Sequence, residues 1–330
     1  MATLVLTITE TLRYRGKLGQ WSWALHRIAG LGTLFFLFLH VIDTSWASLY
    51  PNLYAGAISL YQSPLFTIGE FALVACVVYH ALNGFRIVIF DWKPQWWHRQ
   101  ADAAKLVALG TIILLVPTFA IMLNATISHY REVGIDLRLT ELISSQAQFI
   151  AAIVVILILG IVVSAVYSLV PSSNTSKKGK ASAFDRFMWV FMRVSGVIII
   201  PLVFGHLGMI HVIQGVFDIT AKGMVPVGTT LGPNVTGTAV EFVSLRWNTM
   251  FAGIFIWRIY DVCLLVLAVI HGFNGLRYVI NDYVHNVIIN RGMQLAILGT
   301  AVGLIVVGSL AFISTVPVST AQLAAGLPVH

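Results

Sequence analysis

The sequence predicts an all-α fold, a polytopic bundle of about seven transmembrane helices. Its composition excludes an ordinary soluble domain, because 58% of the 330 residues are hydrophobic, 10% are charged, and the mean hydropathy is +0.87. Several apolar stretches are long enough to cross a bilayer, and one histidine-containing motif occurs twice along the chain. Together these observations predict two membrane-embedded repeats.

A spanning helix needs about 20 mostly apolar residues. Basic residues are concentrated in alternate loops between such stretches. Because loops rich in Lys and Arg stay in the cytoplasm, we expect a multi-pass protein of a prokaryotic cytoplasmic membrane, with its N-terminus inside and its C-terminus outside. We expect no cleaved signal peptide, since the first 19 residues have neither a long apolar core nor a small-residue cleavage site. The predicted spans are approximately 23–46, 66–90, 103–127, 148–170, 189–213, 253–281 and 292–316.

The repeated motif reads H-x-x-N-G-x-R, with an Asp eleven residues after the His. The first copy begins at His80 and reaches Asp91, and the second begins at His271 and reaches Asp282. In each half an Arg also precedes an earlier His by thirteen residues, in the pairs Arg27–His40 and Arg193–His206.

The topology follows from the orientation of these copies. Both start with a basic residue at the inner end of a helix, so three helices each would leave the first repeat ending outside. One extra crossing must therefore precede the second repeat, which gives a 3 + 1 + 3 arrangement. Repeats of the same orientation are related by a pseudo-two-fold axis along the membrane normal. The predicted divisions are a first repeat at 1–147, an extra crossing helix with a cytoplasmic linker at 148–186, and a second repeat at 187–330.

Four histidines are predicted to lie deep in the membrane. Ionisable side chains there are costly and usually face the bundle interior with a partner. A b-type haem is held by two neutral imidazoles on opposite sides of its iron, and a two-fold axis supplies that arrangement. At 1.5 Å rise per residue, the motif His lies roughly 16 Å from its Asp at the inner helix end. His40 lies about 15 Å from Tyr50 at the outer end of its helix, so the two levels differ in depth. We predict an inner pair, His80 and His271, and an outer pair, His40 and His206, each holding one haem b.

Haem propionates require nearby cations. Arg246 and Arg258 are the candidates on the outer side, although snorkelling and charge asymmetry also account for single arginines. Glu70, Asp43 and Asp261 lie in the outer parts of helices, where pairing with Arg258, proton delivery to an outer quinone site and local capping all stay open. The residues predicted to contact propionates are His26, Arg27, Arg193, Arg86, Arg277 and Arg258.

Other features narrow the function. His211 has no counterpart in the first half, and we interpret it as structural or outer-facing. Cys76 and Cys263 lie in apolar runs at unrelated positions, which predicts neither a disulfide framework nor a thiolate metal site. The net charge of +7 is explained by membrane topology rather than by nucleic-acid binding.

At these motifs the chain resembles a known family, the cytochrome b membrane anchors of succinate:quinone oxidoreductases (succinate dehydrogenases and fumarate reductases). The segment Trp23–Gly30 is similar to that family's S-x-x-H-R-x-[ST]-G entry to its first helix. The run His80–Asp91 resembles the haem-ligand helix of the larger anchor subunit, and His271–Tyr283 resembles the H-x-x-x-G…D-Y helix of the smaller one. The resemblance covers the first two helices of each half and implies two small anchors fused into one polypeptide.

The resemblance also implies cofactors, partners and a quinone site. One-haem relatives use the positions of His80 and His271, and two-haem relatives add those of His40 and His206, so two haem b are implied. Partners would be a flavoprotein subunit and an iron–sulfur subunit on the cytoplasmic face; a higher oligomer of the complex stays open. No dicarboxylate active site is expected, because the chain has neither a dinucleotide fingerprint nor an iron–sulfur cysteine cluster. Menaquinone is favoured over ubiquinone, because two stacked haems suit a low-potential quinone. The implied quinone-binding residues are Ser22, Trp23, Arg27, Asp282 and Tyr283.

Two other functions are weighed against this one. Cytochrome b anchors of hydrogenases or formate enzymes typically carry two ligating histidines on one helix, whereas here each deep His lies on its own helix. A transporter built from parallel repeats explains duplication and intramembrane charge, but it does not explain matched histidine pairs at two depths.

Overall fold

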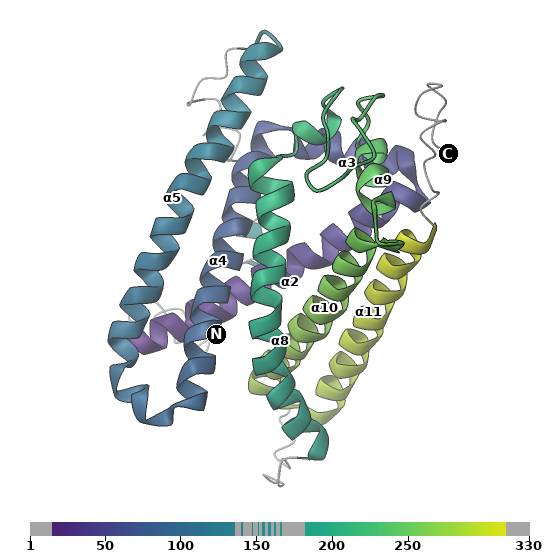
Figure 1. The fold of residues 1–330 in the computed structure, drawn as a ribbon. Helices are drawn as coiled ribbons and strands as arrows, with labels where there is room; N and C mark the ends of the chain where they lie inside the picture. The colour runs from purple at the N-terminus through teal and green to yellow at the C-terminus, as the bar shows by residue number, and fades with distance from the viewer. Residues whose placement is uncertain are drawn as a thin grey trace.

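The computed structural model describes residues 15–135 and 182–314, with a few isolated positions between 140 and 166. The described residues are all-α apart from one hairpin, whose two strands have two residues each (Figure 1). The first half contains α2 (Leu18–Leu49), α3 (Pro51–Tyr61), α4 (Pro64–Trp92), η1 (Pro94–Arg99) and α5 (Gln100–Glu132). The second half contains α8 (Ala183–Leu207), the π-helical turn η2 (Gly208–Ile213), η3 (Asp218–Thr220), α9 (Ala239–Asn248), β1 (Met250–Phe251), β2 (Ile254–Phe255), α10 (Ile256–Tyr283) and α11 (Val287–Ser314).

Six helical segments in the described part are long and apolar enough to cross a membrane, which confirms six of the predicted spans and a polytopic bundle. They are α2, α4, η1 with α5, α8 with η2, α10 and α11. Hydropathy located these helices well because bilayer thickness fixes their length. The predicted crossing at 148–170 lies outside the described residues except for isolated positions.

Four helices form the centre of the bundle. α2 packs against α4 and α10, and α8 packs against the same two helices, while α5 covers α4 and α11 covers α10 and α2 (Figure 1). One end carries Arg27, Arg193, Asp91 and Asp282, and we call it the basic end. The opposite end carries α3 and α9, and we call it the capped end (Figure 1).

Local sequence signals explain several helix starts. Pro51 and Pro64 occupy the first turns of α3 and α4, where the missing backbone N–H costs no hydrogen bond. Ser182 and Asp185 form a capping box at the start of α8, and Thr238 caps α9 through the backbone N–H of Glu241. The segment 214–249 lies between two predicted spans, and the structure shows α9 of this segment folded against α3, α2 and α10.

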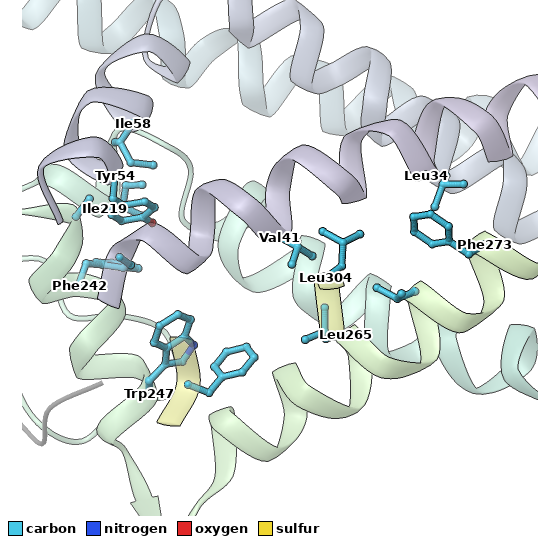
Figure 2. Packing of buried hydrophobic residues seen from close by; sticks show 14 residues of the cluster. Leu34, Val41, Tyr54, Ile58, Ile219, Phe242, Trp247, Leu265, Phe273 and Leu304 are labelled. Atoms are coloured by element: carbon cyan, nitrogen blue, oxygen red, sulfur yellow. The ribbon is translucent and has the colours of Figure 1, made fainter. Parts of the chain in front are cut away.

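The apolar core follows α2 along its length. Figure 2 shows Leu34 near Phe273, and Val41 near Leu265 and Leu304, where α2 meets α10 and α11. The same cluster continues to Phe242 of α9 at the capped end. A Cβ on Gly308 would lie 2.6 Å from Leu265 Cδ2, so this glycine lets α11 approach α10 closely.

The end of α5 and the start of α8 lie at opposite ends of the bundle. α5 begins at the basic end, where Arg86 donates to the carbonyl of Gln100, and it ends at the capped end, where Tyr130 donates to the carbonyl of Gln62. α8 begins again at the basic end, close to Asp91.

Candidate haem-binding cavity

A continuous cavity of about 750 Å³ runs between α2, α4, α8 and α10. Its α2 lining extends from Trp23 to Ser45, roughly 33 Å at 1.5 Å rise per residue, which is close to the bilayer's hydrocarbon thickness. Most of the lining is apolar. The imidazoles on its wall are His26, His40, His80, His206, His211 and His271.

The predicted inner pair faces across this cavity. The ring centroids of His80 and His271 are 6.4 Å apart, with the rings at 89° to each other. Two imidazoles that ligate one metal from opposite sides have centroids about 6 Å apart, because the metal–nitrogen bond is about 2 Å and the ring centre lies about 1 Å further. The separation therefore suits one iron between the two rings.

Hydrogen bonds fix which nitrogen of each inner ring is available. His80 Nδ1 lies 3.1 Å from the carbonyl oxygen of His26, and His271 Nδ1 lies 2.9 Å from Ser195 Oγ. A ligating His ordinarily donates its second ring N–H to such an acceptor. Both rings are thus oriented with Nε2 left for a metal. Ser195 was not anticipated from the sequence, because its contact depends on how α8 and α10 pack.

Two glycines make room for these rings. A Cβ at Gly30 would lie 2.8 Å from His80 Cε1, and a Cβ at Gly196 would lie 3.4 Å from His271 Cε1. Each of these glycines follows Arg27 or Arg193 by three residues, so the two halves use the same position. Gly84 also lines the cavity, and a Cβ there would lie 3.4 Å from His26 Cε1.

The predicted outer pair lies at a second level. The ring centroids of His40 and His206 are 5.9 Å apart, again in an edge-to-face arrangement. Each lies ten residues beyond the glycine that contacts an inner ring, which corresponds to roughly 15 Å along α2 or α8. The cavity therefore contains two imidazole pairs at two depths.

His211, which has no counterpart in the first half, joins the outer level of the cavity. Its ring centroid is 5.5 Å from that of His206 and 6.3 Å from that of His40. The cause is the π-helical turn over Gly208–Ile213, since a wider turn brings a residue five positions on back to the same side. His211 Nδ1 lies 2.6 Å from Glu70 Oε1.

Two carboxylates also line the outer level, and sequence reasoning left their roles open. Glu70 precedes His80 by ten residues and Asp261 precedes His271 by ten residues, so they are counterparts in the two halves. That shared spacing was the sequence signal that could have placed both beside the outer pair. Asp43, in contrast, accepts a hydrogen bond from Tyr61.

The predicted propionate contacts divide into two groups. His26, Arg27 and Arg193 line the cavity at or near the basic end. Arg27 pairs with Asp282, and its Cζ lies 4.0 Å from the ring centroid of Trp23. Arg193 pairs with Asp91 at 2.8 Å, and its Cζ lies 3.9 Å from the ring centroid of Trp189. The remaining three, Arg86, Arg277 and Arg258, are not among the residues lining this cavity.

These three arginines have other contacts. Arg86 donates to the carbonyl of Gln100, and Arg277 pairs with Asp185 at 3.0 Å. Arg258 donates to the carbonyls of Trp247 and Phe312 and to Asn248 Oδ1.

The residues implied for quinone binding are also divided. Trp23, Arg27 and Asp282 lie together at the basic end of the cavity. Ser22 is buried and donates instead to Asn83 Oδ1 at 2.8 Å, and the side chain of Tyr283 is exposed.

Buried polar atoms indicate what the cavity can accept. His26 Nδ1, Arg27 NH1 and His206 Nδ1 are buried without a hydrogen-bond partner among the described residues. Apolar walls, facing imidazole pairs and a cation at one end are the surroundings that a haem requires. The residues present therefore fit haem b at both levels.

Comparison with known proteins identifies the family. The model of the succinate dehydrogenase/fumarate reductase transmembrane subunit matches residues 8–119 and 170–312, which is most of the chain. The chain belongs to this family. It is accordingly a multi-pass membrane anchor that serves as a subunit of such an enzyme complex.

Two relatives illustrate the membership. The succinate dehydrogenase 2 membrane subunit SdhC of Mycobacterium tuberculosis is 34% identical over 136 residues, which is 40% of this chain and 100% of that protein. The succinate dehydrogenase hydrophobic membrane anchor subunit of Halobacterium salinarum is 34% identical over 107 residues, 31% of this chain and 80% of that protein. No solved structure matches the chain significantly. Each relative thus corresponds to less than half of this anchor.

Proposed function

We propose that this anchor is a dihaem cytochrome b, which passes electrons between a peripheral flavoprotein and iron–sulfur module and membrane quinone. The observation that carries the proposal is the presence of two facing imidazole pairs, 6.4 and 5.9 Å apart, at two depths of one cavity. Family membership disfavours the anchor of an unrelated dehydrogenase and the transporter.

Each level would hold one haem b through its two histidines. Bound haem supplies reversible one-electron transfer at its iron. The chain's own residues orient the ligands: Ser195 and the His26 carbonyl engage the inner Nδ1 atoms, and the apolar walls exclude water. Arg27, Arg193 and His26 are the cavity-lining candidates for propionate contacts, with Arg86, Arg277 and Arg258 further away.

The two halves would be same-orientation repeats, joined by the extra crossing at 148–170. Equivalent positions make equivalent contacts across the halves, because Arg27 pairs with Asp282 while Arg193 pairs with Asp91. A 136-residue relative that aligns over its full length supports a fusion of two anchors.

The basic end would face the cytoplasm and receive the flavoprotein and iron–sulfur subunits, in the cytoplasmic membrane of a prokaryote. Its charged side chains include Arg27 and Asp282 beside the cavity mouth. Quinone would bind near Trp23, Arg27 and Asp282, and menaquinone suits the two-level arrangement better than ubiquinone.

Spectroscopy of the purified complex tests the proposal. Wild type should give a b-type redox-difference spectrum and two haems per chain by pyridine haemochrome. His80→Ala or His271→Ala should remove the inner haem, and His40→Ala or His206→Ala the outer one. His98→Ala is the control, because His98 lies in η1 away from the cavity. Absence of b-type absorbance under full haem supply, or retention of both haems in all four variants, would contradict it.

A further inference from the structure

We infer that Asp261 is a positioning residue for the outer haem: its carboxylate, oriented by Trp247 and Arg246 of the segment 214–249, accepts the Nδ1 proton of His206. The inference rests on the proposed function, because it requires iron at His206 Nε2. It assigns roles to a buried carboxylate and to an outer segment that the anchor function alone leaves unexplained.

Two complementary atoms carry the argument. His206 Nδ1 and Asp261 Oδ1 are both buried and have no hydrogen-bond partner among the described residues. They lie 3.9 Å apart, somewhat beyond the usual hydrogen-bond range of about 2.7–3.2 Å. An imidazole that gives Nε2 to a metal carries its hydrogen on Nδ1 and needs an acceptor there. Each atom thus lacks a hydrogen bond that the other could complete.

Trp247 and Arg246 already hold the carboxylate in place. Trp247 Nε1 donates to Asp261 Oδ2 at 3.0 Å, which turns Oδ1 towards His206. Arg246 NH2 lies 3.7 Å from Oδ1, and its guanidinium stacks on Trp257 at 4.0 Å. A carboxylate in the membrane interior needs such a cation to stay ionised.

Arg246 depends on this carboxylate in turn. The Arg246 residue is only 4% exposed, and its NH1 and NH2 atoms have no hydrogen-bond partner in the described part of the chain. Burial lowers the pKa of the guanidinium, and the charge of Asp261 is the main influence that raises it again. The pair therefore stabilises both charges beside the outer level.

Hydrogen bonds from Arg258 hold the end of α9 beside Asp261. Arg258 of α10 donates to the carbonyl of Trp247, to Asn248 Oδ1 and to the carbonyl of Phe312 in α11. Trp247 also packs against Phe312, with ring centroids 4.8 Å apart (Figure 2 shows Trp247 in this cluster). Arg258, expected as a propionate contact, thus clamps α9 to the two helices beside Asp261.

The groups beside the Nδ1 atoms of the inner pair carry no charge. The acceptors there are the His26 carbonyl and the Ser195 hydroxyl, both neutral. A carboxylate acceptor raises the basicity of its imidazole and favours ferric over ferrous iron, because the extra negative charge stabilises the more positive state. Asp261 should therefore lower the potential of the outer haem specifically.

Potentiometric titration of the whole complex tests this inference. Asp261→Asn keeps the shape and the contact with Trp247 but removes the charge. The outer haem should become easier to reduce by about tenfold in its equilibrium constant, an upward shift of about 59 mV for one electron, while the inner haem is unchanged. The outer haem is recognised by its absence from His40→Ala. Selective loss of that haem from Asp261→Asn would equally support positioning of His206.

Further variants keep the outcome decisive. Trp247→Phe removes the Nε1–H donor but keeps an aromatic ring against Phe312, and it should also shift or loosen only the outer haem. Asp185→Asn removes one negative charge near the basic end and should leave the outer potential unaltered. If Asp261→Asn assembles without either haem, the potential and content of the outer haem in Trp247→Phe decide whether the inference holds.

The results separate the two levels of the argument. If wild type has an outer haem and either decisive variant leaves its potential and content unchanged, the inference about Asp261 is wrong while the dihaem proposal stands. If wild type lacks the outer haem, the proposed function itself fails at that level.

Discussion

At the scale of single residues, the two histidine pairs differ in the groups that lie beside their Nδ1 atoms. Ser195 and the His26 carbonyl lie within hydrogen-bond distance of the inner Nδ1 atoms. At the outer level three imidazoles converge, and two of them, His206 and His211, lie beside carboxylates. Ligand identity there depends on which Nε2 faces His40, and this can be tested by substitution.

We expect His206→Ala and His211→Ala to differ. His206 is the counterpart of His40 in the repeat and lies closer to it, so its loss should remove the outer haem. His211 is bound to Glu70, and its loss should retain that haem with affinity reduced by at most about 10–100-fold, as for an outer-shell partner. Haem stoichiometry and low-temperature spectra measure both. The opposite pattern would make His211 the ligand.

At the scale of helices, close approach at small residues positions the rings. Gly30 and Gly196 lie where α2 meets His80 and where α8 meets His271. Every residue except glycine carries a Cβ, so only glycine leaves room for an imidazole ring this close to the helix backbone. The π-helical turn after α8 has a comparable role at the outer level, since it directs His211 into the cavity.

Gly30→Ala should therefore damage the inner haem site. Its Cβ would lie 2.8 Å from Cε1 and 2.9 Å from Nδ1 of His80, which forces the ring away from the His26 carbonyl. Overpacking of this kind costs about 1–3 kcal/mol, so inner-haem affinity should fall by roughly five- to 150-fold. Haem titration of the apo-complex measures the change.

Gly32→Ala is the matched control on the same helix, since its Cβ would meet only Cys76 Sγ at 3.4 Å. It should bind the inner haem almost as wild type does. Equal losses in the two variants would mean that helix packing in general, rather than contact with His80, limits haem binding.

At the scale of the whole molecule, spans and histidine pairs were predictable because simple lengths determine them. Bilayer thickness fixes helix length, and equal spacing from Arg27 and Arg193 puts His40 and His206 at equal depth. Contacts that depend on side-chain direction were not predictable: Ser195 on His271 and Ser22 on Asn83 are examples.

The outer segment was likewise beyond sequence reasoning. Its fold relies on tertiary hydrogen bonds, such as those from the backbone N–H groups of Val235 and Thr236 to the buried Glu241 carboxylate. No periodic pattern in this Gly- and Thr-rich sequence predicts these hydrogen bonds. The proposed role of Trp247 and Arg246 rests on their position beside Asp261, which only the structure gives.

The extra crossing can be tested by accessibility. Because α5 ends at the capped end and α8 begins at the basic end, residues 148–170 should span the membrane. In a Cys76→Ser/Cys263→Ser background, Val133→Cys and Thr230→Cys should react with a membrane-impermeant maleimide on intact cells or spheroplasts. Ser176→Cys, in the predicted linker, should react only after permeabilisation. Labelling of Val133→Cys and Ser176→Cys from the same side would refute the 3 + 1 + 3 topology, and labelling of Ser176→Cys alone from outside would reverse the proposed orientation.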